Sequence, residues 1–207
     1  MSSRNSPHHK LNLYVVDDDE AVRRSLMMLL FASGQPVQAF ASGEAFLEAL
    51  DPQQPGCVIL DLRMGQGLLS GLEVFERLLG LHSPLVVLFL SGHGEIAMAI
   101  EAVKKGAFDW VVKPNTAELL AKLPQALDAA QARADALTRW RLLTPREREV
   151  ARHVALGRPN KEVARMLDPP CSPRSVESHR AHLFAKLDFA NDNELGRWLQ
   201  HHAWLQD

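Results

Sequence analysis

The chain has 207 residues, of which 46% are hydrophobic and 23% are charged. This length favours two compact domains over one, and the composition excludes a largely disordered chain. No apolar run approaches the roughly 18 residues needed to cross a bilayer, and the first residues lack the apolar segment of a signal peptide. We therefore expect a cytoplasmic protein without a membrane partner.

The two parts of the chain carry opposite net charges. Residues 1–130 contain 10 Lys and Arg against 15 Asp and Glu, a net charge of −5, whereas residues 131–207 contain 13 against 10, a net charge of +3. An acidic first part suits cations, and a basic second part suits polyanions. The cysteines, Cys57 and Cys171, fall in different parts and lack metal-ligand spacing, which predicts two reduced, unpaired thiols.

The first part alternates between strand and helix signals. Short apolar or β-branched runs predict five strands, at residues 11–16, 36–39, 58–60, 85–90 and 110–112. Helical spacing of apolar residues predicts helices between them, at 21–31, 44–50, 72–79 and 96–104. This alternation predicts an α/β domain with a five-stranded, doubly wound parallel sheet covered on both faces.

From residue 117 onward the chain shows helix signals only. Residues 117–140 predict a last helix that extends into a linker, with Pro124 in its first turn or at a kink. Thr144 and Glu147 have the spacing of a capping box, and four helices follow, at about 145–156, 160–167, 173–187 and 192–202. We therefore expect domains at residues 10–127 and 142–207, joined by a helical linker at 128–141.

Acidic residues follow two of the predicted strands. Asp17, Asp18 and Asp19 come directly after the first strand, and Asp61 follows the third. Ligands of parallel sheets bind at the carboxyl ends of the strands, and clustered carboxylates there suit Mg²⁺. The alternative is a solvated run of charge without a ligand.

Asp61 has the position of a nucleophile. A carboxylate presented at the end of a buried strand can attack phosphorus and form an acyl phosphate. Because phosphoryl transfer depends on positioning and on neutralisation of charge, the site also needs cations. A metal ion and Lys113, which follows the last strand, would supply them.

Four motifs occur in order along the first part: Val-Val-Asp-Asp-Asp-Glu at 15–20, Val-Ile-Leu-Asp-Leu-Arg-Met at 58–64, Leu-Ser-Gly-His-Gly at 90–94, and Lys-Lys-Gly-Ala-Phe-Asp-Trp-Val-Val-Lys-Pro at 104–114. Together they resemble the receiver domain of two-component response regulators, especially the FixJ type. The resemblance implies a flavodoxin-like fold and phosphorylation of Asp61 by a sensor histidine kinase. It also implies that Mg²⁺ (or Mn²⁺) binds to Asp17, Asp18, Asp61 and the backbone carbonyl of Arg63.

The same resemblance assigns the rest of the site. Ser91 would hydrogen-bond the phosphoryl group, Lys113 would pair with it, the Lys113–Pro114 peptide would be cis, and Trp110 would be the aromatic switch. A homodimer would form on phosphorylation. The sequence departs from the family at residues 65–69, where the loop is about two residues longer, and at Asn115, which replaces the customary Phe.

Three further motifs, which start at Leu143, Gly157 and Ser172, resemble the LuxR/FixJ helix-turn-helix. Val176, Leu183 and Leu187 form one inward stripe of its third helix. The resemblance implies that this helix reads double-stranded DNA in the major groove, and that the protein regulates transcription with RNA polymerase as a further partner. We expect Glu177, Ser178 and Ala181 to face the bases, and Lys161, Arg174, Arg180 and Lys186 to contact phosphates.

Two alternative functions compete with a transcription regulator. The first is an aspartyl-phosphate hydrolase of the haloacid dehalogenase class, but those enzymes carry two aspartates one residue apart on the first strand, and here Asp61 lies on a later strand. The resemblance implies no enzyme beyond the receiver's own phosphoryl transfer and dephosphorylation. The second is an interaction protein without DNA affinity, which rests only on a turn at Asp168 about two residues longer than usual. His179 and His182, like His201 and His202, lack a ligand set that would favour a metal.

Overall fold

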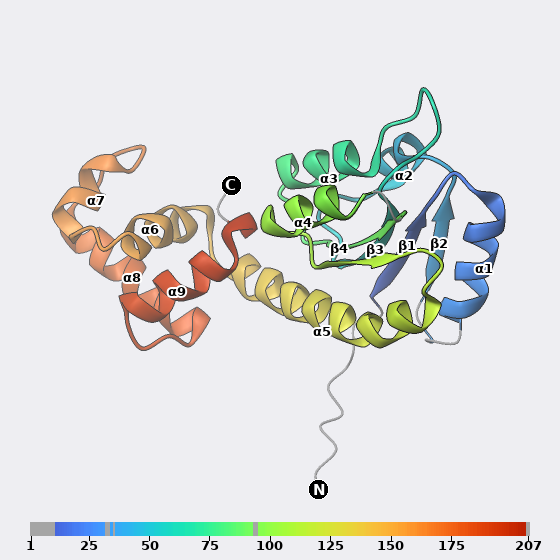
Figure 1. Cartoon of the computed structure of the whole chain (residues 1–207). Coiled ribbons are helices and arrows are strands. Elements are labelled where there is room, and N and C mark those ends of the chain that lie inside the picture. Colours follow the sequence, from blue (N-terminus) through green and yellow to red (C-terminus); the bar gives the residue numbers. More distant parts are fainter. Residues whose placement is uncertain (1–10, 32–33, 35, 93–94, 206–207) are drawn as a thin grey trace, which may run out of the picture. The chain divides into compact units, whose positions relative to one another are not determined.

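The structure is a computed structural model that describes residues 11–31, 34, 36–92 and 95–205 (Figure 1). Residue 10, where the predicted first domain begins, and His93 and Gly94 of the third motif lie outside the described residues. The chain divides into two compact units, Met1–Ala134 and Asp135–Asp207, and each is described by itself below. No helix within the described residues has the length and apolar character that crossing a membrane requires.

The first unit contains the predicted five-stranded parallel sheet. Its strands are β1 (Asn12–Val16), β2 (Val37–Phe40), β3 (Gly56–Asp61), β4 (Val86–Ser91) and β5 (Asp109–Val112), in the order β2-β1-β3-β4-β5. All four neighbouring pairs are parallel. The doubly wound fold is therefore confirmed, although β3 is longer than predicted and includes Asp61.

Helices cover both faces of this sheet (Figure 1). They are α1 (Glu20–Phe31), α2 (Gly43–Ala49), α3 (Gly71–Gly80), α4 (Ile96–Lys104) and the first part of α5 (Thr116–Arg141). One core cluster joins the sheet to α1 and α5 through Leu26, Leu30, Leu119 and Leu123. The other joins its opposite face to α2, α3 and α4 through Phe46, Val74, Leu78 and Ala102. The central strands β3 and β4 are buried throughout, because helices pack on both of their faces.

The second unit is all-helical around one core, which contains Val150, Val163, Val176, Leu183 and Leu195. Its elements are α6 (Pro145–Ala155), α7 (Asn160–Met166), α8 (Pro173–Leu187), α9 (Asp192–His201) and the short 3-10 helix η1 (Ala203–Leu205). The predicted capping box of Thr144 and Glu147 is present at the start of α6. The helix α5 is continuous across the predicted linker, and Pro124 lies inside it, beyond its first turn.

A glycine at the start of α3 lets that helix approach the end of β3. A Cβ atom at Gly71 would lie 2.1 Å from the backbone oxygen of Asp61 and 3.0 Å from the Cα of Leu62. Ser70, just before it, caps the helix with Glu73 in a capping box. The sequence at 70–73 therefore fixes α3 directly beside the backbone of Asp61.

Replacing Gly71 by Ala should reduce the free energy of unfolding by about 2 to 3 kcal/mol, because backbone atoms of β3 cannot yield to the new methyl group. The matched control is Gly80→Ala in the same helix, where a Cβ atom would meet nothing within 4 Å. That change should stabilise the protein by about 0.5 to 1 kcal/mol. Urea unfolding of both variants measures the contrast, and equal stabilities would contradict the close approach.

Candidate functional site

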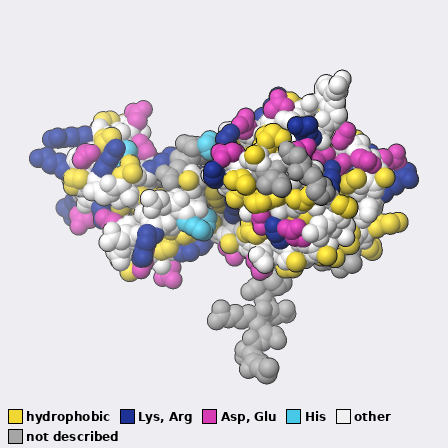
Figure 2. All heavy atoms as spheres, viewed as in Figure 1, with side chains coloured by type: hydrophobic (Ala, Val, Ile, Leu, Met, Phe, Trp, Pro, Cys, Tyr) yellow, Lys and Arg dark blue, Asp and Glu magenta, His cyan; other side chains and the backbone are white. Residues whose placement is uncertain are grey.

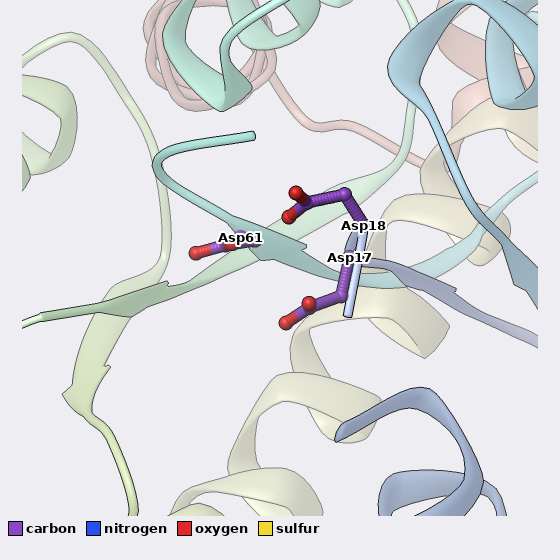
Figure 3. A group of neighbouring side chains, drawn as sticks. All are labelled: Asp17, Asp18 and Asp61. Atoms are coloured by element: carbon purple, nitrogen blue, oxygen red, sulfur yellow. The ribbon is translucent and has the colours of Figure 1, made fainter. Parts of the chain in front are cut away.

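Three carboxylates meet at the carboxyl ends of β1 and β3 (Figure 3). Asp17 and Asp18 follow β1, Asp61 ends β3, and each offers an oxygen within 4.8 Å of the others. The two strands are neighbours, with Val16 paired to Leu60, so the next residues along each strand lie side by side. All three carboxylates point to the same side in Figure 3. Asp17 and Asp61 are buried, whereas Asp18 is exposed.

Backbone amides orient these carboxylates. Asp17 accepts a hydrogen bond from the amide of Asp19 at 2.9 Å, and Asp61 accepts a longer one from the amide of Arg63 at 3.4 Å. Asp18 accepts from the amide of Gly65 at 3.0 Å. The loop at 65–69, which the resemblance gives as longer than usual, thus binds Asp18 through its first residue.

Lys113 reaches into the same site. Its Nζ lies 2.7 Å from Oδ2 of Asp17 and 3.0 Å from Oδ1 of Asp61. The peptide bond that follows it, Lys113–Pro114, is cis. Three ionised carboxylates and one ammonium group leave two negative charges, and the acidic oxygen ligands are of the kind that Mg²⁺ prefers. The donor set therefore fits a divalent cation.

The electrostatics of the site make Asp61 easier to protonate than an exposed aspartate. Burial raises the pKa of Asp61 to about 6, the Lys113 ammonium group opposes this, and the charge of Asp17 adds to it. Burial also opposes the charge on Lys113, but the two carboxylates outweigh it and raise the pKa of the ammonium group. Lys113 is therefore a cation at neutral pH, and a divalent cation beside Asp61 would further favour the ionised form of that carboxyl.

Ser91 supplies an unused hydroxyl group beside this cluster. It ends β4, the strand next to β3, and its Oγ is buried without a hydrogen-bond partner among the described residues. A buried hydroxyl without a partner calls for an explanation, and a ligand that it would bind is one such explanation. Trp110, on β5, is half-buried, and Lys122 donates from Nζ to its carbonyl oxygen at 2.7 Å and lies over its ring.

Sequence reasoning missed Glu95, a buried carboxylate that links two loops of the site. It accepts from the amide of Gly92 at 2.7 Å and lies 3.1 Å from Nε of Arg63. Gly92 follows Ser91 and Arg63 follows Asp61 by two positions, so Glu95 joins the ends of β4 and β3. An acidic residue directly before an apolar helix is a weak signal, and no motif singled it out.

The helix α8 separates into an inward face and an exposed face. Val176, Leu183 and Leu187 are fully buried. The exposed residues include Arg174, Glu177, Ser178 and Ala181, whose spacing of three, four and seven residues places them on one side of the helix. Lys161 is exposed at the start of α7, and Figure 2 shows Lys and Arg side chains over that helix.

The four basic residues that we expect to contact DNA phosphates differ in whether they are bonded within the protein. Lys161 and Arg174 make no hydrogen bond or ion pair with another described residue. Arg180 instead donates from Nη1 to Asn160 at 3.1 Å and from Nη2 to Asp192 at 2.5 Å. Lys186 donates to the buried Glu147 at 2.7 Å. Two of the four are therefore already bonded within the helical unit.

The histidine pairs show no metal site. In the part of the chain that the structure describes, the sole group of three or more metal-ligating side chains is Asp17, Asp18 and Asp61. The disfavoured metal sites at His179 and His182, and at His201 and His202, thus gain no support.

Two family models match the chain. Residues 13–124 match the model described as the response regulator receiver domain, and residues 141–199 match the model described as bacterial regulatory proteins of the luxR family. The regulatory protein FixJ of Bradyrhizobium diazoefficiens is 38% identical over 96% of this chain and 98% of its own length. The tetrathionate response regulatory protein TtrR of Salmonella typhimurium is 38% identical over 89% of this chain and 90% of its own.

Solved structures agree with these matches. The crystal structure of full-length FixJ from B. japonicum has a TM-score of 0.55 and 36% identity, and the comparison covers 94% of this chain and 98% of that one. The structure of the response regulator StyR has a TM-score of 0.53 and 31% identity, and the comparison covers 93% of this chain and 100% of that one. Both likenesses span the two units of the chain.

In the absence of a divalent cation, Asp61→Asn should stabilise the protein at neutral pH. A carboxyl whose pKa is raised by folding costs stability once the pH exceeds its unfolded pKa of about 3.9, and the cost is complete above its folded pKa. With a folded pKa of about 6, the cost is roughly 1 to 3 kcal/mol at pH 7.5 and falls toward zero near pH 4.

Thermal unfolding in a chelator, from about pH 4 to pH 7.5, measures this difference. The control is Glu48→Gln, an exposed carboxylate on α2 whose replacement should change little. Mg²⁺ should then stabilise the wild-type chain but not the Asn variant. An Asp61→Asn variant that is less stable than wild type at pH 7.5 would contradict this electrostatic account.

Proposed function

The chain belongs to the response regulators that join a receiver domain to a LuxR-type DNA-binding domain, and we propose that a sensor histidine kinase phosphorylates it on Asp61. Phosphorylation then promotes dimerisation and sequence-specific binding to double-stranded DNA, through which the protein regulates transcription together with RNA polymerase. Its chemistry is limited to its own phosphoryl transfer and dephosphorylation. The observation that carries this proposal is the buried Asp61 beside Lys113 and the acidic pair Asp17 and Asp18.

The phosphoryl transfer uses the arrangement of these side chains. An Oδ of Asp61 attacks phosphorus, a P–O bond forms, and the bond from phosphorus to the donor nitrogen of the kinase breaks. Asp17, Asp18, Asp61 and the Arg63 carbonyl would hold Mg²⁺ (or Mn²⁺), which neutralises negative charge on the phosphoryl oxygens when bound. Lys113, already an ion-pair partner of Asp61, stays beside the new acyl phosphate as its counter-charge.

Ser91 and Trp110 would connect the phosphoryl group to the surface formed by α4 and β5. The unpartnered Ser91 hydroxyl can donate to a phosphoryl oxygen, which would draw the end of β4 toward Asp61. Trp110 then moves inward and alters the face formed by α4 and β5, which we assign as the dimer contact. The phosphate must favour this conformation energetically for the population to shift.

The exposed face of α8 is the proposed DNA-reading surface. Glu177, Ser178 and Ala181 face base edges, and Glu177 can accept a hydrogen bond from cytosine N4. The exposed cations Lys161 and Arg174 contact backbone phosphates. Arg180 and Lys186 also contact phosphates in this proposal, and each would give up an internal partner, Asp192 or Glu147, to do so.

Acetyl phosphate with Mg²⁺ should add one phosphoryl group to the wild-type chain and none to Asp61→Asn, because only Asp61 combines strand-end position with Lys113 and the acidic pair. Intact-protein mass and sedimentation at micromolar concentration measure phosphorylation and the expected increase in dimer. Full acid-stable labelling of Asp61→Asn would show that another residue is modified. An unchanged sedimenting mass would reject dimerisation while leaving the phosphorylation site intact.

Replacing Lys161 or Arg174 by Ala should weaken binding to all DNA sequences about equally and flatten the salt dependence by about one unit. Arg180→Ala and Lys186→Ala should do the same, but they also remove an internal bond, so their thermal stability is measured in parallel. Glu177→Ala should change the preferred base at one position, by about 1 to 3 kcal/mol.

Competition binding against single-base variants of a selected DNA site distinguishes these effects. A preference profile that Glu177→Ala leaves unchanged and Arg180→Ala alters would reverse the proposed orientation of α8. Absence of any DNA retention by the wild-type chain at low salt would favour the interaction protein over the transcription regulator.

A further inference from the structure

The turn between α7 and α8 is held by side chains of α6. This α7–α8 turn comprises Asp168, Pro169, Pro170 and Cys171, and it is the segment about two residues longer than usual in the resemblance. It precedes Ser172, the N-cap of α8. The position at which α8 begins therefore depends on how the turn is fixed.

Two α6 residues, Arg146 and Glu149, bind both polar groups of the Asp168 backbone. Arg146 donates from Nη1 to the carbonyl oxygen of Asp168 at 3.0 Å and from Nη2 to that of Pro169. Glu149 accepts from the amide of Asp168 at 3.1 Å. The two side chains also form an ion pair with each other, with 2.7 Å between Nη1 of Arg146 and Oε2 of Glu149, so they hold the turn together.

The composition of the turn makes this external support necessary. Pro169 and Pro170 have no backbone N–H groups, so they cannot contribute donors to a hydrogen-bonded turn. The remaining donors are the amide of Asp168, which Glu149 takes, and that of Cys171, which donates to Ala164 at 2.9 Å. The turn is thus bonded to α6 at one end and to α7 at the other.

We propose that Arg146 and Glu149 are positioning residues that set the placement of the DNA-reading helix α8, and through it the affinity and sequence preference of DNA binding. The inference rests on the proposed function. A shift of the turn moves Ser172 and, with it, the exposed residues Arg174 and Glu177 in the first turns of α8. Arg146 itself does not touch DNA in this proposal, because its donors are directed at the turn and at Glu149.

This role differs from a contribution to the core. The side chains of Arg146 and Glu149 are 22% and 30% exposed, and neither belongs to the buried cluster around Val150 and Val176. Partly exposed ion pairs contribute little to global stability. Loss of the pair should therefore change where the turn lies more than whether the domain folds.

The test compares Arg146→Ala, Glu149→Ala and the double variant with Arg148→Ala in the full-length chain. Arg148 is a matched control, because it is an α6 arginine that also donates to backbone carbonyls, those of Trp140 and Arg141, away from the turn. Affinity for a selected DNA duplex is measured over a salt series, and thermal unfolding is measured in parallel.

Arg146→Ala should weaken DNA binding about tenfold, the scale of one lost base contact, without changing the salt slope. Arg148→Ala should leave affinity unchanged at a similar unfolding temperature. The double variant should lose no more than the larger single variant, because both residues hold the same turn. Arg146→Lys should not restore affinity, since one ammonium group cannot replace a guanidinium group that donates to two carbonyl oxygens and a carboxylate.

Cys171 provides a readout in the turn itself. It is partly exposed, whereas Cys57 is buried with its pKa raised to about 12 by burial, so a thiol reagent should modify Cys171 first. Arg146 lies beside the Cys171 thiol and would affect its reactivity directly, so the variant to use is Glu149→Ala, which frees the Asp168 amide. Release of the turn by Glu149→Ala should accelerate modification of Cys171 several-fold relative to Arg148→Ala.

Three outcomes would overturn the inference: affinity of Arg146→Ala equal to that of Arg148→Ala, a salt slope reduced by about one unit as for a phosphate contact, or unchanged reactivity of Cys171 in Glu149→Ala. A wild-type chain that retains no DNA is a different result. It would reject the proposed DNA-binding function, and the positioning role with it, whatever the Cys171 rates are.

Discussion

Two carboxylates buried at the ends of neighbouring strands are the constraint on which the first unit depends. Asp17 and Asp61 lie side by side because β1 and β3 are parallel and in register, and their charges repel in surroundings from which water is largely excluded. Lys113 relieves this repulsion by pairing with both. It follows β5, two strands away from β3, so its long side chain connects opposite parts of the sheet edge.

In this geometry, a change in the charge of Asp61 can change the positions of the groups around it. A change of charge on Asp61 acts directly on Lys113, and the same sheet edge carries the unpartnered hydroxyl of Ser91. Glu95 adds a second connection, because it binds the loop after β4 and the Arg63 side chain beyond β3 at once. Ion pairs thus join the acidic cluster to Lys113, and Glu95 joins the two adjoining loops at the same sheet edge.

The sequence predicts the parts of this arrangement that depend on local pattern. Apolar runs followed by Asp17 and Asp61 identify the sheet edge, because ligands of parallel sheets bind at the carboxyl ends of the strands. The start of β3 was missed, since Gly56 is a poor strand former and its pairing with β1 supplies the strand geometry. Arg180 and Lys186 look like free surface cations in the sequence, yet their partners lie on other helices, up to 39 residues away for Lys186. Such tertiary pairs leave no local signal.

The two segments that are longer than in the family pattern are fixed in the same way, by side chains that bind their backbone. The longer loop at 65–69 is bonded at both ends, through the amide of Gly65 to Asp18 and the amide of Leu69 to Glu44. The longer turn after α7 is bonded through Asp168 to Arg146 and Glu149. Lengthening a loop adds little entropic cost when its ends are fixed, and a side chain that takes a backbone group fixes an end without altering the core. The longer loop and the longer turn can therefore be accommodated while the strand ends and the exposed face of α8 keep their arrangement. The side chains that bind these segments are then the residues through which the segments could tune ligand and DNA binding.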